Sequence, residues 1–556
     1  MLKKISAFLT RGELLEKYAF RLSLLFCFFF SAAFIVRTGT QIAGRAYFTL
    51  FDDAMISMRY AQNLAAGNGL TWNISGDKIE GFTNFLWTLW MAVLHLIPVH
   101  ESKASLLVML SCSAILLVNL FVIRALLREH GASLFVKLLV LPCVALYYPI
   151  YFWTLRGMEV GFLMLLLNAS LLTGYKLIKQ FTLSRLFFLS ALLCMGALTR
   201  TDFIPPALVI SAAAGLLCEK KYRITALFCV TGSILVSFSA HSFFSYFYYG
   251  DFLPNTYYLK LTGVTLGERL SRGIEMFISL SRQHLLALFL FAPCMIFLLK
   301  KKEGRNGLFA LVLAALCAMQ IGYSVYVGGD AWEWMRYANR YVTPIVPLLF
   351  IVIALGIDAL VRAAPRMPKL TPVVLSVCLC FLWTAKISGT HYRLWLNNNC
   401  HHIYDDLAWM ELGVWLSNNT REDATLGVFC AGSIPYFAHR TAIDFLGKMD
   451  RTIAKSEPRV ALYTGQTRES RFYPGHNKWD YDYSIGKLQP DFIVQLWRVV
   501  TPKDIEKQLI GWGYLQIGDE MFVKNTSMPK INFAAFNARP EKPKDLLEQL
   551  SDTLKK

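Results

Sequence analysis

An acidic pair, Asp52 and Asp53, follows the apolar run Leu22–Val36 by fifteen residues and therefore stands close to a predicted membrane surface. A carboxylate at that place could act as a general base toward a lipid-borne substrate, by taking a proton from an acceptor hydroxyl. The hydroxyl oxygen would then attack a sugar carbon in a direct displacement. Such a base typically contributes ~10²–10⁴-fold in rate.

The two aspartates are adjacent in the chain, and adjacent side chains on a helix diverge by about 100°. We therefore do not expect Asp52 and Asp53 to act as a matched acid–base pair across one glycosidic bond. One could face a substrate while the other caps the N-terminus of a helix, a common role for aspartate. The alternative is that residues 37–84 form only a polar connector between two membrane spans.

The segment 37–84 mixes carboxylates with arginine, tryptophan and tyrosine, as a sugar-binding site would. Apolar residues of Ala54–Ala66 recur at helical spacing, which predicts a short helix lying on the membrane surface. Four glycines then break the chain into compact turns: they are Gly67, Gly69, Gly76 and Gly81. The candidate substrate contacts of this loop are Arg59, Tyr60, Glu80 and Asn84.

A phosphate leaving group would need cationic partners. Candidates stand at predicted outer ends of membrane spans: Arg200, Lys260, Arg336 and Arg340. For each of them, a cation that only snorkels to the membrane surface is the alternative. Glu159 begins an apolar run, where a buried acid is costly and often functional. Pairing of Glu159 with Arg156 would explain that acid equally well.

Several other kinds of site find no support. The histidines His391, His401 and His402 lack a metal-binding spacing, and we expect them at the surface. The chain has no phosphate-cradling glycine loop, no paired CxxC motif and no G-x-S-x-G serine motif.

The composition indicates a membrane protein. The chain has 556 residues, of which 55% are hydrophobic, and a mean hydropathy of +0.42. Soluble globular chains are about 45–50% apolar, and here the excess lies in repeated runs of roughly twenty residues, the length of a spanning helix. The net charge of +18 is explained by Lys and Arg in cytoplasmic loops and near anionic lipid heads, so nucleic acid is not an expected partner.

Basic residues before the first span place the N-terminus in the cytoplasm and Asp52 on the outer side. If the later basic clusters are also cytoplasmic, the chain crosses the membrane about eleven times. The apolar stretch 85–98 has only fourteen residues, which is short for a span, so we expect a partial or re-entrant element there. Twelve crossings, with local violations of the charge rule, are the alternative.

From about residue 388 the chain becomes more polar and contains no run that could span a bilayer. Residues 1–387 are thus expected to form the membrane domain, and residues 388–556 a soluble α/β domain with a loosely held tail at 538–556. The expected helices are Tyr404–Asn418 and Ile505–Ile510, and the expected strands are Ala424–Cys430, Thr441–Phe445, Phe492–Trp497, Tyr514–Ile517 and Met521–Lys524. Cys400 and Cys430 could pair if this domain faces an oxidising compartment.

An ordered set of motifs resembles the GT-C fold glycosyltransferases, with the terminal arabinofuranosyltransferases of bacterial cell-envelope synthesis as the nearest type. The first loop carries F-D-D-A-M-I-S-M-R-Y at 51–60 and I-E-G-F-T-N-F-L-W at 79–87. Matches in the membrane domain are R-G-M-E at 156–159, L-T-R-T-D at 198–202, Y-Y-G-D-F-L-P-N-T-Y-Y-L-K at 248–260 and G-G-D at 328–330. Matches in the C-terminal domain are A-G-S-I-P-Y-F at 431–437, I-D-F-L-G at 443–447 and P-G-H-N-K at 474–478.

The resemblance implies a multi-pass enzyme of the bacterial inner membrane with its active site on the outer face. Such an enzyme transfers a sugar, with inversion, from a polyprenyl-phosphate donor to an extracytoplasmic glycan, lipid or protein. The base of these enzymes comes from an acidic motif in the first outer loop, and we favour Asp52 as base with Asp53 orienting substrate. Further substrate contacts implied by the motifs are Glu159, Asp202, Asn255, Tyr258, Asp330, His476 and Lys478.

One departure concerns Thr201, where relatives often carry a proline after the arginine, which puts the geometry near Arg200 in doubt. The donor sugar does not follow from the resemblance, although the family label names arabinofuranose. No cofactor is expected, because a monophosphate donor does not require one; Mg²⁺ or Mn²⁺ held by Asp52 and Asp53 is the alternative.

Two other classes of protein compete with the enzyme. A lipid-linked sugar transporter or flippase should carry its charges near mid-membrane, whereas the charges here cluster at the outer ends of spans. A non-catalytic envelope-assembly protein would use the loop only to dock partners, and it would tolerate Asp52→Asn.

Overall fold

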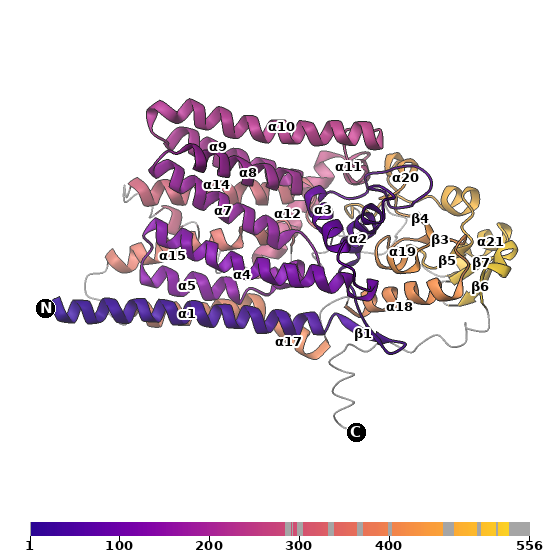
Figure 1. Ribbon diagram of the computed structural model, residues 1–556, viewed down its shortest axis with the longest axis horizontal. Coiled ribbons are helices and arrows are strands. Elements are labelled where there is room, and N and C mark those ends of the chain that lie inside the picture. The colour runs from indigo at the N-terminus through magenta and orange to yellow at the C-terminus, as the bar shows by residue number, and fades with distance from the viewer. Residues whose placement is uncertain are drawn as a thin grey trace, which may run out of the picture.

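The computed structural model describes residues 2–283, 291, 293–296, 304–331, 339–363, 371–398, 403–459, 472–497, 502–518 and 521–532. A bundle of long helices forms one part of the molecule, and a smaller domain with a sheet sits at one end of the bundle (Figure 1). Helices α2 and α3 lie where the two parts meet (Figure 1). Helix α4 (Ala104–His130) ends at Gly131, which takes the left-handed conformation with φ 78°.

The bundle contains long apolar helices that pack on one another; α4, for instance, contacts α1, α5 and α7. Its helices are α1 (Leu2–Val36), α4 (Ala104–His130), α5 (Leu134–Ala145), α6 (Tyr148–Leu155), α7 (Val160–Lys179), α8 (Leu183–Thr199), α9 (Ile204–Leu217), α10 (Arg223–Tyr249), α14 (Gly304–Tyr326), α15 (Val346–Ala363), α16 (Thr371–Trp383) and α17 (Gly389–Asn398). Two further helices, α11 (Asn255–Leu261) and α12 (Leu266–Gln283), connect α10 to the rest of the chain.

Seven helices among the described residues are long and apolar enough to cross a membrane, and the bent pair α5–α6 would make an eighth. They are Gly12–Val36, Glu101–His130, Val160–Lys179, Lys220–Tyr249, Gly307–Tyr326, Thr343–Ala363 and Val374–Asn397. Shorter apolar helices over Leu183–Thr199 and Thr201–Leu217 lie in the same bundle (Figure 1). The chain is therefore a polytopic α-helical membrane protein, as predicted, while the count of eleven crossings stays a prediction.

The first loop, residues 37–84, is compact. It contains the antiparallel hairpin β1 (Gly39–Ile42) and β2 (Arg45–Phe48), then α2 (Asp52–Ala65) and an irregular return segment. The next helix, α3 (Phe85–His95), has eleven residues and is too short to cross a bilayer, consistent with the partial element expected there.

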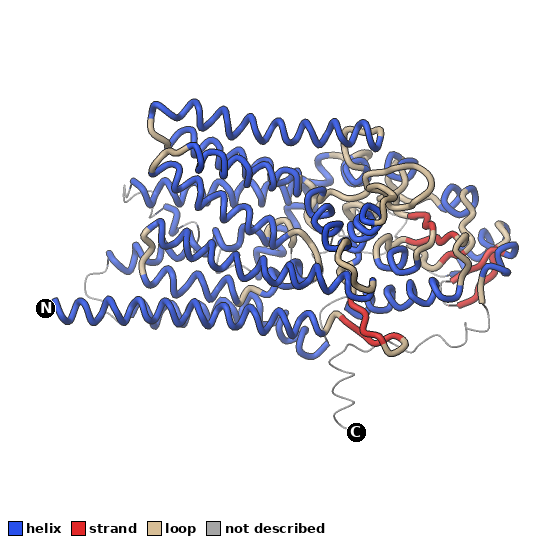
Figure 2. Tube along the Cα trace, in the orientation of Figure 1, coloured by secondary structure: helices blue, strands red, loops and turns tan. Residues whose placement is uncertain are grey.

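The C-terminal domain is built on a five-stranded sheet of order β4-β3-β5-β7-β6, gathered at the far end of the molecule (Figure 2). Strand β3 pairs in parallel with β4 and β5, and β7 is antiparallel to β5 and β6. The strands are β3 (Thr425–Val428), β4 (Thr441–Asp444), β5 (Phe492–Ile493), β6 (Tyr514–Gly518) and β7 (Met521–Lys524), and the helices are α18 (Ile403–Asn419), α19 (Ser433–Ala438), α20 (Arg451–Lys455) and α21 (Pro502–Gly511). All five strands and both helices expected from the sequence are present.

The division at residue 387 stays a prediction; this residue falls inside the continuous helix Val374–Asn397, and α18 is the next described element. One expectation is corrected. Helix α2 does not lie on an open surface, because ten of its fourteen residues are buried and α19 packs against it. The tail 538–556 and Cys400 lie outside the described residues, so the possible pairing of Cys400 with the buried Cys430 is not tested.

Candidate functional site

A charged cleft opens where α2, the end of the first loop, the bundle and the C-terminal domain meet. Its volume is about 460 Å³ including the open mouth. The described residues that line it are Asp53, Ile56, Ser57, Gly81, Phe82, Thr83, Asn84, Met158, Glu159, Arg200, Thr256, Lys260, Arg340 and Lys448. Six of these were predicted as site residues, and they come from five separate stretches of the chain: Asp53, Asn84, Glu159, Arg200, Lys260 and Arg340.

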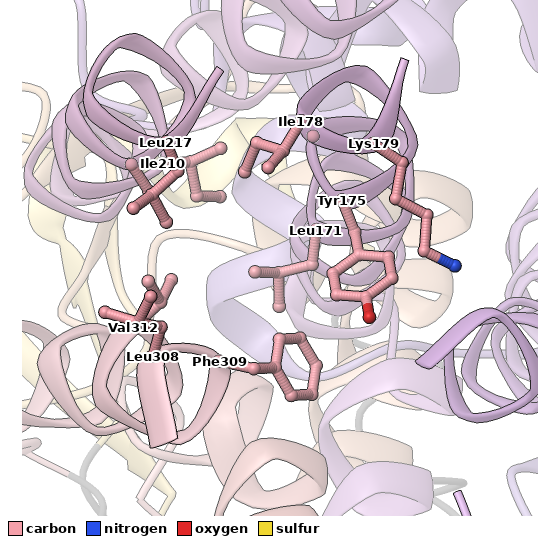
Figure 3. Close-up of a pocket in the computed structure, with 11 residues that line it drawn as sticks. Leu171, Tyr175, Ile178, Lys179, Ile210, Leu217, Leu308, Phe309 and Val312 are labelled. Atoms are coloured by element: carbon pink, nitrogen blue, oxygen red, sulfur yellow. The ribbon is translucent and has the colours of Figure 1, made fainter. Parts of the chain in front are cut away.

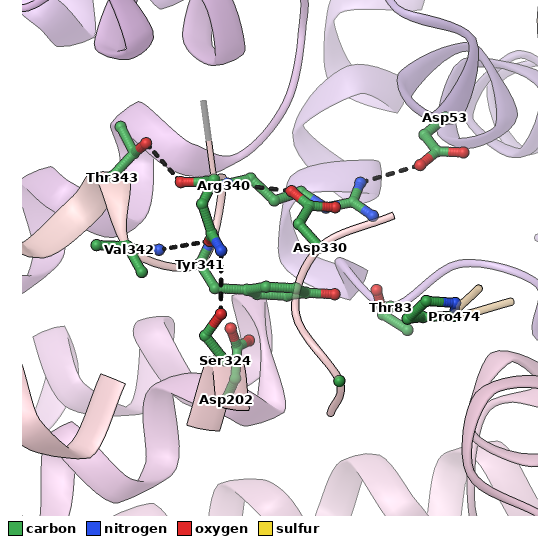
Figure 4. Close-up of polar contacts among 12 residues, drawn as sticks. Asp53, Thr83, Asp202, Ser324, Asp330, Arg340, Tyr341, Val342, Thr343 and Pro474 are labelled. Carbon is green, nitrogen blue, oxygen red and sulfur yellow. Dashed lines mark hydrogen bonds and ion pairs between the residues drawn. The ribbon is translucent and has the colours of Figure 1, made fainter. Parts of the chain in front are cut away.

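Asp53 lies between two cations of this cleft. The Lys448 ammonium is 2.6 Å from Oδ1, and Arg340 Nη1 is 2.9 Å from Oδ2. Figure 4 shows the contact between the Arg340 guanidinium and the Asp53 carboxylate. Burial opposes ionisation of the carboxyl, but Lys448 and Arg340 outweigh it and hold the pKa of Asp53 well below its ordinary value. The carboxylate is thus ionised, and its side chain keeps 15% exposure toward the cleft.

Asp52 points away from the cleft. Its Oδ1 accepts a hydrogen bond from the Ser433 backbone N–H at 2.7 Å, and its Oδ2 accepts one from Gly432 at 3.3 Å. Burial, the largest effect, raises the pKa of Asp52 to about 6. Asp52 was favoured as the base, but the two side chains diverge on α2 and only Asp53 lines the described cleft; which aspartate acts as the base stays a prediction.

Arg340 is aimed at Asp53 by the Gly-Gly-Asp turn. Asp330 accepts the Arg340 backbone N–H at 3.1 Å and forms an ion pair with its guanidinium at 3.2 Å (Figure 4). Gly328 and Gly329 take φ 86° and 79°, a conformation that favours glycine. Asp330 therefore positions Arg340 and does not line the cleft itself. The other predicted cation of this segment, Arg336, lies outside the described residues.

Arg200 anchors a second network on the opposite wall. Its guanidinium pairs with Glu159 and with Asp202, both at 2.7 Å. The Asn84 amide donates to Glu159 at 2.9 Å, so the carboxylate is held on both sides. The partner of Glu159 is thus Arg200, whereas Arg156 forms a buried ion pair with Asp406 of α18. Asp202 stands behind Arg200 and is not part of the lining.

Lys260 differs from the other cations of the cleft in its ion pairing. No carboxylate among the described residues lies within ion-pair distance of its ammonium, whereas Arg200 and Arg340 each have two and Lys448 has one. Its aliphatic chain runs beside Gly475, close enough for Cε to meet a Cβ there at 3.4 Å. Lys260 is therefore the cation most available to a bound anion.

Arg59 and Tyr60 were predicted to bind substrate, but they hold the first loop to the C-terminal domain. The Arg59 guanidinium donates to the carbonyls of Trp72, Pro435 and Arg440 and is 6% exposed. The Tyr60 hydroxyl donates to the Ile79 carbonyl at 2.5 Å and accepts from the Gly81 N–H at 3.1 Å. Tyr60 thus holds the segment Ile79–Gly81, and Gly81 lines the cleft.

Three further predicted contacts lie beside the cleft. Glu80 is buried, with Oε1 3.4 Å from Nε2 of His241. Asn255 donates to three carbonyls of the turn that carries Lys448, at 2.8, 3.1 and 3.2 Å. The Tyr258 hydroxyl donates to Asp251 at 3.3 Å. None of the three is in the described lining of the cleft, and their predicted contact with substrate stays a prediction.

The P-G-H-N-K motif folds into a tight turn against α11. Lys478 donates to Tyr258 O, Thr262 Oγ1 and Ala454 O, which uses all three of its N–H groups. His476 is buried, and burial together with the Lys448 charge lowers its pKa to about 3. This motif thus shapes the wall near Lys260, and its two predicted residues do not line the cleft.

Lys448 was missed by the sequence analysis. It directly follows the I-D-F-L-G motif at 443–447, so the motif marked the right turn but stopped one residue short. Nothing local distinguishes this lysine from a surface lysine, because its partner Asp53 is 395 residues away in the chain.

The described residues contain no group of three or more His, Cys, Asp or Glu side chains placed to hold a metal ion. Both oxygens of Asp53 already contact cationic side chains, and Asp52 is turned away from it. The aspartate pair therefore does not form a shared oxygen cradle of the kind considered for Mg²⁺ or Mn²⁺.

A larger cavity, of about 1080 Å³, lies between α7, α9 and α14 (Figure 3). Its lining is almost entirely apolar, and its one cation, Lys179, points out of it and pairs with Glu129 at 2.8 Å. Apart from Lys179 and Tyr175, its described lining holds no ionisable side chain, so the charged cleft is the candidate site despite its smaller size.

The chemistry available in the cleft is that of a carboxylate among cations. Four cations and two carboxylates line it, and two further carboxylates, Asp202 and Asp330, neutralise the arginines from behind. Such preorganised cations can stabilise negative charge that develops on a phosphate during a reaction. The same cleft offers Asp53 as an acceptor for a hydroxyl proton.

The fold is similar to that of ArnT from Cupriavidus metallidurans bound to undecaprenyl phosphate, with a TM-score of 0.51 and 12% identity over 91% of this chain and 97% of that chain. The apo crystal structure of ArnT gives a TM-score of 0.49 at 12% identity, covering 94% and 98%. Residues 398–526 match a family described as a domain of unknown function, DUF8728. No curated protein matches the sequence. The chain thus has the ArnT-like GT-C fold that its motifs predicted.

Proposed function

We propose that the chain is an inverting glycosyltransferase that transfers a sugar from a polyprenyl-phosphate donor to an acceptor hydroxyl. The observation that carries this proposal is the single cleft in which Asp53 lies among Arg200, Lys260, Arg340 and Lys448. A bound undecaprenyl phosphate in the ArnT structure of the same fold supports a lipid phosphate as the donor's carrier.

The donor phosphate would occupy the cationic part of the cleft. A polyprenyl-phosphate sugar is a phosphodiester with one negative charge, and its cleavage leaves a phosphate monoester with two. The four cations and the four carboxylates of the cluster balance while Asp53 is ionised. When Asp53 takes a proton, one further positive charge is uncovered beside the leaving phosphate, which matches the charge that develops there.

The reaction is a direct displacement at the anomeric carbon. The acceptor oxygen forms a bond to that carbon from the face opposite the phosphate, and the carbon–oxygen bond to phosphate breaks with its electron pair going to the phosphate. The hydroxyl proton passes to the Asp53 carboxylate. Attack from the opposite face gives inversion.

The setting proposed for this reaction is the outer face of a bacterial inner membrane, with an envelope glycan, lipid or protein as acceptor. Arabinofuranose is one candidate sugar, since the motifs resemble terminal arabinofuranosyltransferases. We propose that no metal ion is needed, because four cationic side chains already surround the place assigned to the phosphate.

The test is sugar transfer by the purified protein in lipid, with a panel of polyprenyl-phosphate sugars, for wild type, Asp53→Asn and Asp52→Asn. We expect Asp53→Asn to lower the rate by about 10²–10⁴-fold, while Asp52→Asn stays within about tenfold of wild type, since its role is in docking. A chelated wild-type sample should keep its rate.

Thermal unfolding of each variant controls for loss of fold. Full activity of Asp53→Asn would contradict the assignment of the base. Labelled lipid crossing the bilayer without any transfer would favour a transporter, and recovery of a chelated sample by Mg²⁺ or Mn²⁺ would contradict metal independence.

A further inference from the structure

The turn that carries Lys448 connects β4 to α20 and is rigidly built. The Asp444 carboxylate accepts backbone hydrogen bonds from Leu446 and Met449, both at 2.9 Å. Gly447, in the middle of the turn, takes φ 79°. These bonds fix the turn from the side of the sheet.

The membrane domain holds the same turn from the other side. Asn255, at the start of α11, donates its side-chain amide to the carbonyls of Gly447, Lys448 and Asp450. Gly81 of the first loop packs directly against Met449, and a Cβ at Gly81 would also lie 3.0 Å from the Lys448 carbonyl. The Lys448 backbone is therefore fixed by elements of both parts of the molecule.

The side chain of Lys448 then reaches out of its own domain. Its ammonium is 2.6 Å from Asp53 and is 13% exposed, on the cleft side. Every other described lining residue comes from between residues 53 and 340. Lys448 is thus the one contribution of the C-terminal domain to the described lining.

We propose that the C-terminal domain completes the active site by supplying Lys448 as a cation for the donor phosphate, with Asn255 as the residue that positions it. This inference rests on the proposed function. Lys448 pairs with Asp53 and contacts the phosphate when donor binds, so that it links the base to the leaving group. Asn255 touches neither and acts through the turn.

The test compares Lys448→Met, Asn255→Leu and their double variant in the full-length protein in lipid. Lys455→Met is the matched control, because Lys455 also joins the two parts of the molecule, through Asp251 at 3.1 Å, but does not line the cleft. We expect Lys448→Met and Asn255→Leu each to lower kcat/KM at least about tenfold, the equivalent of 1.4 kcal/mol. The double variant should lose no more activity than Lys448→Met alone, since both changes remove the same contribution, that of the Lys448 ammonium.

A second measurement does not need turnover. Lysine amines of the wild type are labelled with acetic anhydride, with and without undecaprenyl phosphate, and quantified by mass spectrometry. We expect undecaprenyl phosphate to protect Lys448 and to leave Lys455 unchanged. In Asp53→Asn, where the Lys448 ammonium loses its anionic partner, the pKa of Lys448 should fall and its titration should move to lower pH.

The outcomes separate this inference from the proposed function. Sugar transfer with Lys448→Met equal to Lys455→Met would overturn the inference and leave the glycosyltransferase standing. Fully additive losses in the double variant would overturn the positioning role of Asn255. If no donor sugar is transferred, protection of Lys448 by undecaprenyl phosphate still supports its role as a phosphate cation, and absence of protection overturns it.

Discussion

Two neighbouring aspartates have opposite environments because of what each meets across the interface. Asp53 meets Lys448 and Arg340, which lower its pKa well below the ordinary range despite burial. Asp52 meets only two backbone N–H groups, and burial raises its pKa to about 6. Asp53 is therefore ionised in the cleft, while Asp52 holds α2 to the turn Ala431–Ser433 through hydrogen bonds.

The raised pKa of Asp52 predicts a pH dependence of stability. A group whose pKa rises on folding, here from 3.8 to about 6, stabilises the fold below the lower value and loses that contribution as pH rises through the upper one. A shift of about two units corresponds to about 3 kcal/mol. We expect the difference in Tm between wild type and Asp52→Asn to fall between pH 4.5 and pH 7.5, because the amide does not titrate. A difference that stays constant, or grows with pH, would contradict this assignment.

At the scale of elements, α2 is a connector between the bundle and the C-terminal domain. Its N-terminal end holds Asp52 against α19, and Arg59, two turns further along, binds carbonyls of the same domain. Asn73 extends the connection: its amide exchanges hydrogen bonds with the Ala442 backbone of β4, at 2.9 and 3.1 Å. The charged cleft exists because these contacts bring β4 and its turn to Asp53.

Gly432 lies directly against the backbone of Asp52, so substitution of Gly432 tests whether the C-terminal domain docks on α2. A Cβ at Gly432 would overlap the Asp52 backbone carbonyl and lie 2.8 Å from its Oδ1. We expect Gly432→Ala to destabilise the protein by about 1–3 kcal/mol, as overpacking does, and to make the C-terminal domain easier to release by limited proteolysis.

The control is Gly511→Ala, because nothing lies within 4 Å of a Cβ at Gly511. Unchanged Tm and proteolysis in Gly432→Ala, relative to Gly511→Ala, would mean that α2 and the turn Ala431–Ser433 are not in contact in solution.

The whole molecule is asymmetric along its long axis. The sheet domain lies at one end of the bundle, and the connection between α9 and α10, which contains Lys220, lies at the other (Figure 1). The cleft is lined by Lys448 of the sheet domain and therefore lies at the first of these ends. The positive-inside rule predicts that Lys220 and Lys221 lie in the cytoplasm, and on this ground we propose that the cleft lies on the outer side.

This orientation predicts the labelling of two engineered cysteines. Glu457→Cys, exposed in the C-terminal domain, should react with a membrane-impermeant maleimide in intact cells. Lys220→Cys, exposed at the other end, should react only after the membrane is permeabilised. The unsubstituted protein gives the background from native thiols. The reverse pattern would place the cleft in the cytoplasm and exclude an extracytoplasmic acceptor.

The sequence by itself determined the membrane class, the strands of the C-terminal domain, α2 and five of the six charged residues in the described lining of the cleft. Each of these depends on neighbours in the chain: apolar length, alternation, helical spacing and short motifs. Arg200, Lys260 and Arg340 could be predicted because each stands at the end of an apolar run, where a charge is conspicuous.

Only the tertiary structure decided which aspartate faces the cleft, what Arg59 and Asn255 do, and that Lys448 belongs to the site. These facts depend on side chains that are far apart in sequence, such as Asp53 and Lys448, which are separated by 395 residues. Both aspartates share the same local sequence, so nothing local tells them apart. The difference arises from packing, because docking of the C-terminal domain gives Asp52 two backbone donors and gives Asp53 a lysine.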